Sequence, residues 1–473
     1  MTTTLTFAKG APAYQWDALM GDLLSLGTWV NFDGTLFSAH LRYNELSLEV
    51  YGPMELQSQD LSGGPVSKMV LRDGTTTIAT WNFTHYVDAL QIQVLIGNTK
   101  KSEVASTIAT LYGGETVLVQ GSSAYDLIHG GAAHDVIVGR KGSDSIDGGG
   151  GLDEVRYSSE GGSKAVYVNL SAAMYTIKGV KLAPGEARDT YGSLDTLSNI
   201  ESVTGTKRDD YFVGPSWWAD PDAVVFFSGG RGKDTIIGGS TGIVGVRYDD
   251  AAVEGGKHGV IVNLTYERAS GVDARSARDT YGDIDTIKGV NTVVGSRFGD
   301  KILGSGSSDK FWGGAGKDTI KGNSGSDYLH GGSGNDTLNG GYGADTLVGG
   351  KGRDVLEGGS SGDQFVFSDL ADSRGGSSSR DYIRDFKPGT DKIVFENIDA
   401  DTTLEGLQAF IIDGKVSKGQ RPEKGHINWY WVDKSGKSDD RTIIRVNVDD
   451  NPRADMEIEL KGLLKLSAGD FIV

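Results

Sequence analysis

The chain has 473 residues, of which 71 are glycine and none is cysteine, and its formal net charge is −18. The absence of cysteine excludes disulfide bonds, thiolate metal sites and cysteine nucleophiles. The acidic balance argues against nucleic acid or an anionic membrane as the main partner, because both would be repelled, and it favours cations. There is no apolar stretch of about 18 residues, so no transmembrane segment is expected. The N-terminus lacks the basic start and apolar run of an ordinary signal peptide.

Residues 1–120 are predicted to form a small, mainly-β domain of unknown role. Tyr43–Tyr51 and Thr76–Phe83 alternate between apolar and polar residues, which is typical of strands. Ser102–Leu111 is predicted to form a short helix with Ser102 as its N-cap.

Nine-residue units repeat from Gly295 to Val366, and a shorter run covers residues 121–155. Two more units surround Asp210 and Asp234, which are 24 residues apart and are expected to lack a neighbour in register. In all fourteen units, glycine stands five residues before an aspartate and an apolar residue stands two residues after it. The candidate metal-binding aspartates are Asp126, Asp135, Asp144, Asp153, Asp210, Asp234, Asp300, Asp309, Asp318, Asp327, Asp336, Asp345, Asp354 and Asp363.

The unit predicts one short strand with one inward apolar side chain, followed by a turn with glycines at positive φ. Two units would close one coil of a parallel β-roll, so aspartates 18 residues apart would stack on one edge. Stacked carboxylates and turn carbonyls offer oxygen ligands that suit Ca²⁺. The glycines assigned to these metal-binding turns are Gly313, Gly316, Gly331, Gly334, Gly340, Gly343, Gly349 and Gly352.

This stacking rule predicts about eight or more calcium ions. The predicted sites lie between Asp300/Asp318, Asp309/Asp327, Asp318/Asp336, Asp327/Asp345, Asp336/Asp354, Asp345/Asp363, Asp126/Asp144 and Asp135/Asp153. In six units the second turn glycine is replaced, and these turns are expected to bind weakly or not at all. The replacements are Ala124, Ala133, Arg208, Phe298, Ser307 and Ser361. Some aspartates could serve only to form turns.

Two inserts, 155–204 and 246–294, interrupt the repeats and resemble each other. Both contain VRY, VNL and ARDTYG in the same order, which indicates an internal duplication. Their aspartates Asp189, Asp195, Asp279 and Asp285 could bind additional ions, although capping of turns is the favoured role. Trp217 and Trp218 could form an interaction site, but the favoured interpretation is that they cover an edge of the roll.

The nonapeptide resembles the RTX (haemolysin-type) calcium-binding repeat of secreted proteins, which implies a β-roll over residues 121–363. Residues 364–473 contain RDYIRDFKPGTDKIVFENID at 380–399 and resemble the C-terminal domain of serralysin-like metalloproteases and RTX alginate epimerases. The resemblance implies a β cap with an uncleaved type I secretion signal, ending here in Asp470, Phe471, Ile472 and Val473. It also implies wider coils at the inserts, the type I secretion machinery as a partner and an extracellular location.

No catalytic motif is apparent. The zinc protease site needs two histidines four residues apart, and no two of the seven histidines have that spacing. The G-x-S-x-G matches at 238–242 and 358–362 lie in or beside repeat units without a following helix pattern, so a lipase is not indicated.

The sequence therefore predicts an all-β, calcium-binding protein without enzymatic activity. It would fold on Ca²⁺ outside the cell and serve as a structural, adhesive or self-assembling protein of a surface layer or matrix. The alternative is a secreted enzyme or carbohydrate-binding accessory module that acts on extracellular polysaccharide.

Overall fold

The computed structural model describes seven strands before residue 100 and most of the chain from residue 117 onward. The described ranges are 29–32, 37–41, 46–50, 54–59, 68–73, 76–86, 89–96 and 117–473 without 122, 124, 216–223, 240–243, 250–255, 377, 402–405, 435–439 and 452. The predicted helix at Ser102–Leu111 and the pair Trp217 and Trp218 lie outside these ranges. Within them, no helix is long and apolar enough to cross a membrane.

The chain separates into two compact units, Met1–Gly239 and Ser240–Val473. Strands form nearly all of the regular structure, which confirms the predicted all-β class. The only helical element in the described ranges is a short 3₁₀ turn, η1 (Ala468–Asp470). The three-part division at residues 120 and 363 stays a prediction.

The first unit begins with antiparallel strands. These are β1 (Trp29–Phe32), β2 (Phe37–Leu41), β3 (Leu46–Val50), β4 (Met54–Gln59), β5 (Lys68–Asp73), β6 (Thr76–Tyr86) and β7 (Ala89–Ile96). One sheet has the order β1–β4–β5–β6–β7, and β2 pairs separately with β3. The strands predicted near Tyr43–Tyr51 and Thr76–Phe83 are therefore confirmed as β3 and β6. At the end of the sheet, β7 pairs in parallel with β8 (Val117–Gln120).

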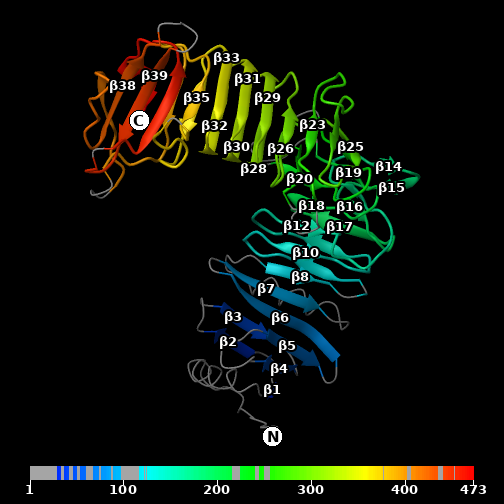
Figure 1. The fold of residues 1–473 in the computed structure, drawn as a ribbon. Helices are drawn as coiled ribbons and strands as arrows, with labels where there is room; N and C mark the ends of the chain where they lie inside the picture. The colour runs from blue at the N-terminus through cyan, green and yellow to red at the C-terminus, as the bar shows by residue number, and fades with distance from the viewer. Residues whose placement is uncertain are drawn as a thin grey trace. The chain divides into compact units, whose positions relative to one another are not determined.

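Short parallel strands on two faces then build a roll (Figure 1). One face consists of β8, β10 (Val136–Val138), β12 (Glu154–Arg156), β18 (Ser202–Thr204) and β20 (Val225–Ser228). The parallel pairs of the other face join β9 (Leu127–His129), β11 (Ser145–Asp147) and β17 (Leu194–Ser198), and also β13 (Tyr167–Asn169), β19 (Tyr211–Val213) and β21 (Thr235–Ile237). The coil of 18 residues predicted from the spacing is visible in the pairing of Ile128 with Ile146.

The first insert is one enlarged coil with added antiparallel strands. Its strand β16 (Glu186–Arg188) lies antiparallel between β13 and β17, and β14 (Tyr175–Ile177) forms a hairpin with β15 (Val180–Leu182). Asn169 of the VNL motif is fully buried, and its amide donates to three backbone carbonyls of the insert. The wider coil matches the expectation from the resemblance, whereas the repeat spacing gives no sign of the antiparallel strands.

The second unit contains the second insert and the long run of repeats. One face has the order β22 (Val244–Arg247), β26 (Thr292–Val294), β28 (Lys310–Ala315), β30 (Tyr328–Gly334), β32 (Thr346–Gly352), β34 (Gln364–Phe367), β36 (Lys392–Phe395) and β41 (Phe471–Ile472). The other has the order β23 (Ile261–Asn263), β27 (Lys301–Leu303), β29 (Thr319–Ser324), β31 (Thr337–Tyr342), β33 (Val355–Ser360), β35 (Asp381–Ile383) and β40 (Met456–Lys461). In the insert, β24 (Ser276–Arg278) lies antiparallel between β23 and β25 (Ile284–Lys288), as in the first copy.

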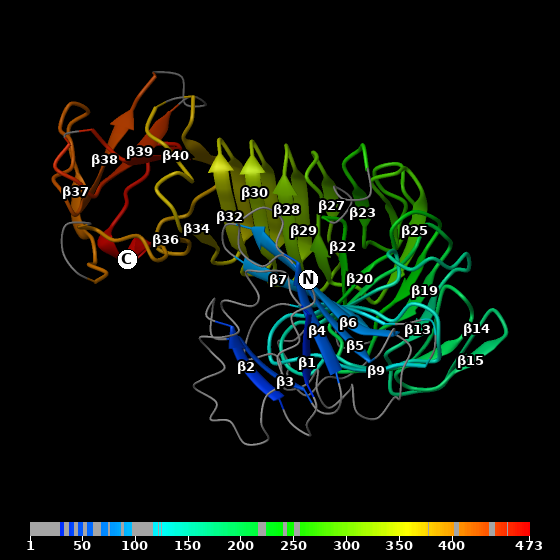
Figure 2. The same cartoon turned by 90° about the horizontal axis from the view of Figure 1, so that it is seen from below.

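The core of this roll is built mainly from one fully buried apolar side chain per strand, to which some strands add a second. Ile320, Leu338 and Leu356 stack on one face, and each is fully buried. Figures 1 and 2 show the strands of the two faces as stacked layers of similar width. Because this core is thin, the turns must also contribute stabilising contacts.

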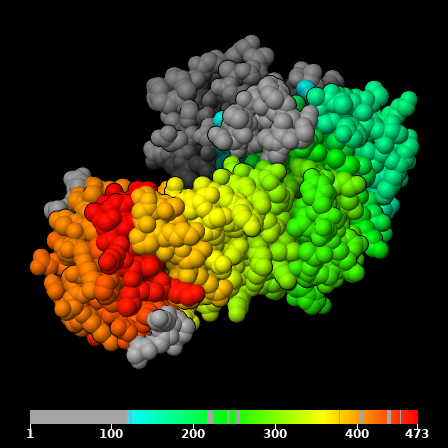
Figure 3. Space-filling model, turned by 90° about the horizontal axis from the view of Figure 1, so that it is seen from above, coloured from blue at the N-terminus to red at the C-terminus, as the bar shows by residue number. Residues whose placement is uncertain are grey.

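The C-terminal residues continue both faces and then close the sheet with antiparallel strands. β40 pairs with β39 (Arg441–Asn447), which pairs with β38 (His426–Val432), and β37 (Ile411–Lys415) lies parallel at the edge. The strands predicted at 428–432 and 443–448 are confirmed as β38 and β39. The C-terminal residues, red in Figure 3, lie between the orange cap strands and the gold last coils, and the Phe471 ring stacks on Trp429.

Candidate metal centre

The repeat aspartates form a hydrogen-bonded ladder along the edge of the roll. The backbone N–H of Asp318 donates to Oδ1 of Asp336 (2.8 Å), and that of Asp336 donates to Oδ1 of Asp354 (2.7 Å). The same bond joins all eight predicted pairs, the others being Asp126/Asp144, Asp135/Asp153, Asp300/Asp318, Asp309/Asp327, Asp327/Asp345 and Asp345/Asp363. The structure thus brings together every predicted pair, while ion binding at each pair stays a prediction.

Asp210 and Asp234 also belong to this ladder. The backbone N–H of Asp210 donates to Oδ1 of Asp234 (2.8 Å), and β19 pairs with β21 in register. The sequence expectation that they lack a neighbour was wrong, because β19 and β21 pair in register although Asp210 and Asp234 are 24 residues apart.

The second carboxylate oxygen of many ladder aspartates is buried without a hydrogen-bond partner. This holds for Oδ2 of Asp153, Asp318, Asp327, Asp336, Asp345, Asp354 and Asp363. We call these seven the open turns. A buried acceptor without a partner costs about 1–3 kcal/mol, and more when it is charged. The open turns therefore need a cation or a proton at Oδ2.

Glycine lets a carbonyl oxygen approach this carboxylate oxygen. A Cβ placed on Gly331 would lie 2.6 Å from both Asp336 Oδ2 and the carbonyl oxygen of Gly349, one coil further on. Gly313, Gly340 and Gly349 likewise face the Oδ2 of their own aspartates. Carboxylate and carbonyl oxygens therefore converge where a side chain would stand, which is an oxygen cradle suited to Ca²⁺.

The first glycine of each turn does not have a positive φ, whereas later positions of many turns do. In the turn before Asp318 it occurs at Gly314 (φ +100°) and at Gly316 (φ +116°), but not at Gly313. The other predicted glycines two residues before an aspartate, Gly334, Gly343 and Gly352, also have positive φ. Close approach, rather than backbone conformation, accounts for the first glycine.

A second group of turns is already satisfied from within. Oδ2 of Asp135, Asp210, Asp300 and Asp309 accepts the backbone N–H of the residue four positions earlier, at 2.5–2.6 Å. We call these the closed turns. All four lack the second turn glycine, with Ala133, Arg208, Phe298 and Ser307 in its place, as expected for distorted units. Asp363, whose turn carries Ser361, is nevertheless an open turn.

Four carboxylates outside the nonapeptides complete the ladder. In the first unit, Asp195 accepts the N–H of Asp144 (2.9 Å) and Glu201 accepts that of Asp153 (3.0 Å). In the second unit, Asp381 accepts from Asp354 (2.7 Å) and Asp391 from Asp363 (3.1 Å). Glu201, Asp381 and Asp391 were missed because an insert or a longer connection replaces the spacing of nine. An acidic residue before or within a strand-like segment is the only signal they offer.

Burial raises the pKa of the ladder carboxyls. The pKa of Asp318 rises to about 8, chiefly through desolvation, with repulsion from Asp300 and Asp336 adding to it. Desolvation raises the pKa of Asp327 to about 7 and that of Asp381 well above its ordinary value. A bound cation stabilises the ionised form of such a buried carboxyl group most strongly.

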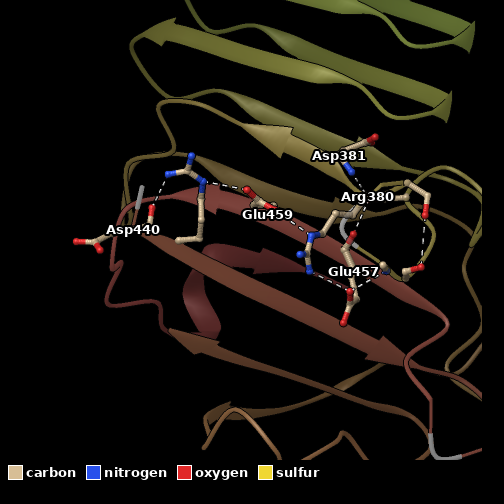
Figure 4. Close-up of polar contacts among 10 residues, drawn as sticks. Arg380, Asp381, Asp440, Glu457 and Glu459 are labelled. Atoms are coloured by element: carbon tan, nitrogen blue, oxygen red, sulfur yellow. Dashed lines mark hydrogen bonds and ion pairs between the residues drawn. The ribbon is translucent and has the colours of Figure 1, made fainter. Parts of the chain in front are cut away.

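An ion-pair network lies beside the last carboxylate of one ladder (Figure 4). The guanidinium of Arg380 donates to Glu459 (2.9 Å) and Glu457 (3.0 Å) of β40, and Arg441 holds the other oxygen of Glu459 (2.9 Å). Arg380 directly precedes Asp381, so the network joins the cap to the ladder.

Family comparison now identifies the repeats. The model of the RTX calcium-binding nonapeptide repeat matches residues 120–155, 226–240, 285–320, 303–338, 321–356 and 339–369. This chain carries RTX repeats. RTX nonapeptides bind Ca²⁺, and the oxygen cradles of the open turns fit that ion. Within the described residues, no three His, Asp or Glu side chains converge as a metal site.

Three solved structures match parts of the chain at low structural similarity. The AlgE6R3 and AlgE6R2 subunits of the Azotobacter vinelandii mannuronan C5-epimerase are 24% and 26% identical, with TM-scores of 0.21 and 0.23. The matches cover 37% and 38% of this chain and 78% and 89% of those chains. The extracellular lipase LipA of Serratia marcescens is 16% identical (TM-score 0.21), over 80% of this chain but 44% of the lipase. No curated protein matches the chain.

Proposed function

We propose that this chain is a secreted protein that folds when Ca²⁺ fills the turns of its RTX roll. The supporting observation is the row of buried carboxylate oxygens without hydrogen-bond partners. At Asp318, Asp327, Asp336 and Asp345 the turn glycine also faces a carbonyl oxygen of the next coil. Calcium would satisfy both kinds of oxygen and cancel the repulsion between stacked carboxylates. Because the core is one side chain thick, loss of the ions should unfold the coils.

Calcium concentration would then decide where the protein folds. Extracellular calcium modules bind with dissociation constants of roughly 10⁻⁴ to 10⁻³ M, so cytosolic calcium is too low to fill them. We propose that the chain remains exportable inside the cell, leaves through type I secretion machinery and folds outside by mass action.

Far-UV circular dichroism with and without calcium tests coupled folding. We expect the strand signal to appear cooperatively as Ca²⁺ is raised towards millimolar, and to collapse when a chelator is added. Millimolar Mg²⁺ is the control, since its demand for octahedral geometry and bound water suits these turns poorly. Retention of the folded signal in excess chelator would contradict the proposal.

For the role of the folded protein, we propose a structural one, in which copies assemble at a surface or in a matrix. The support is the regular outer face of the roll, on which Lys301, Thr319, Thr337 and Val355 stand in register on successive coils. Such a periodic surface can be matched by a second copy of itself.

Sedimentation velocity and electron microscopy, each with and without millimolar Ca²⁺, test assembly. Calcium-dependent lattices or filaments are the expected result. A monomer under all calcium conditions would contradict it, and depolymerisation of glycans by that monomer would establish the alternative, an enzyme acting on polysaccharide.

A further inference from the structure

The first insert buries a carboxylate that does not belong to the ladder. Asp189 of the ARDTYG segment is fully buried, and its Oδ1 accepts the backbone N–H groups of Tyr191 (3.0 Å), Gly192 (2.5 Å) and Ser193 (2.6 Å). These three bonds cap the turn, which is the role favoured from the sequence. They occupy only one of the two carboxylate oxygens.

The other oxygen is buried without a hydrogen-bond partner, and the second insert repeats the arrangement. Oδ2 of Asp189 and Oδ2 of Asp279 are both buried and unpartnered. Oδ1 of Asp279 likewise accepts from Tyr281 (2.9 Å), Gly282 (2.7 Å) and Asp283 (2.8 Å). Capping explains Oδ1 but leaves the cost of the buried Oδ2 unexplained in both copies.

Two further carboxylates of the first insert, those of Glu160 and Asp195, lie near enough to Asp189 to repel it. Glu160 accepts the hydroxyl of Thr190 (2.6 Å), the residue next to Asp189, and Asp195 accepts the hydroxyl of Tyr157 (3.4 Å). Asp195 and Thr190 are buried. We call Tyr157, Glu160, Asp189, Thr190 and Asp195 the insert pocket.

Negative charge in the insert pocket exceeds the positive charge beside it. Glu160, Asp189 and Asp195 repel one another, and the nearby Lys164 ammonium donates to the carbonyl of Tyr191 (2.6 Å). Desolvation, joined by this repulsion, raises the pKa of both Glu160 and Asp195 to about 8. A divalent cation would offset the desolvation of these carboxylates and cancel their mutual repulsion.

We propose that the insert pocket binds a Ca²⁺ ion, with Asp189 Oδ2 as its charged ligand, and that Asp279 marks an equivalent site in the second insert. No three carboxylates converge within the described residues, so hydroxyl, carbonyl or water oxygens complete the shell, as Ca²⁺ accepts. The charged ligands Asp189 and Asp279 lie outside the ladder, because neither accepts a ladder hydrogen bond, whereas Asp195 belongs to both the ladder and the insert pocket.

Asp189→Asn isolates the ion from the cap. Asparagine keeps an oxygen for the three N–H groups of the turn, removes the charge and places an NH₂ group, which cannot bind a cation, where Oδ2 stood. Native mass spectrometry of the full chain at saturating Ca²⁺ should show one ion fewer in Asp189→Asn, one fewer in Asp279→Asn, and two fewer in the double variant. The matched control, Asp273→Asn, removes an equally charged side chain that is 77% exposed and should keep the full count.

An unchanged count in a folded Asp189→Asn protein would overturn the proposal. Should that variant fail to fold, Glu160→Gln keeps an acceptor for the Thr190 hydroxyl and is measured in the same way, and a full count there overturns it equally. Asp336→Asn, in the roll, separates the two kinds of site: a lost ion in that variant alone would support the RTX sites and refute the insert pocket.

Discussion

At the scale of single residues, each ladder aspartate uses its two oxygens differently. Oδ1 of Asp336 joins neighbouring coils by accepting a backbone N–H, whereas Oδ2 is buried without a partner in the protein. In a closed turn such as that of Asp309, Oδ2 accepts the N–H of Ser305 (2.6 Å) instead. The same residue type at the same repeat position is therefore expected to differ in its affinity for calcium.

Asp336→Asn and Asp309→Asn test this difference within one run of repeats. Asparagine at 336 keeps the ladder acceptor but lacks the charge, so we expect the number of bound ions to fall by at least one. At 309 the carboxylate is already satisfied, so we expect little or no change. Native mass spectrometry gives the counts, and an equal loss in both variants would contradict the distinction.

Gly331→Ala tests the oxygen cradle. The added methyl would occupy the point between Asp336 Oδ2 and the Gly349 carbonyl, so we expect the calcium-loaded protein to lose about 2 kcal/mol of unfolding free energy. Gly306→Ala is the control, since a Cβ at Gly306 meets nothing within 4 Å. Calcium titrations followed by circular dichroism should show a higher midpoint for Gly331→Ala alone.

Repeat aspartates could be predicted because the period of nine fixes both strand and turn. Asp381 and Asp391 could not, because they follow their ladder partners by 27 and 28 residues. The first glycine was assigned to a turn for the wrong physical reason: spacing shows where glycine is required but not whether φ or close approach requires it.

At the scale of elements, the cap and the roll form one continuous pair of faces within the second unit. β35 pairs on one side with β33 of the roll and on the other with β40 of the cap. The side chains of Arg380, Glu457 and Glu459 are only 13–17% exposed, so this ion pairing is shielded from solvent. The composition of β38 and β39 predicted strands, but nothing in it predicted their partner.

Arg380→Met should loosen this junction. It leaves the carboxylate of Glu457 without its guanidinium partner, which we expect to cost about 1–3 kcal/mol and to weaken calcium binding at the Asp354 turn. Arg384→Met is the control, because Arg384 forms a solvent-exposed pair with Glu357 at 3.6 Å. Isothermal titration calorimetry should show weaker binding in Arg380→Met only, and equal curves would contradict the coupling.

At the scale of the whole molecule, the acidic composition makes calcium and protons competitors. The pKa of Asp318 is about 8 and that of Asp327 about 7 in the roll, against about 3.9 in an unfolded chain. The calcium-free roll therefore holds protons that the unfolded chain has lost. The contribution of these carboxyl groups to the folding stability of the calcium-free roll is fully present below about pH 4. It is lost as pH rises through 7 to 8.

We expect the calcium-free protein to be more folded at pH 5.5 than at pH 8, and calcium affinity to rise over the same interval. Thermal unfolding in calcium-depleted buffer at both pH values measures the first effect, and calcium titrations measure the second. Equal stability of the calcium-free protein at the two pH values would show that the buried carboxyls do not titrate as argued.

The ladder has a direction. In each of its bonds the donor comes earlier in the chain than the carboxylate that accepts it, as with Asp318, Asp336, Asp354 and finally Asp381. A coil that folds after its C-terminal neighbour finds the acceptor in place, whereas one that folds before it does not. If the chain leaves the cell C-terminus first, each emerging coil would bind to the coil that emerged before it. The roll would then act as a ratchet that prevents backward sliding and converts the calcium gradient into a pulling force on the chain.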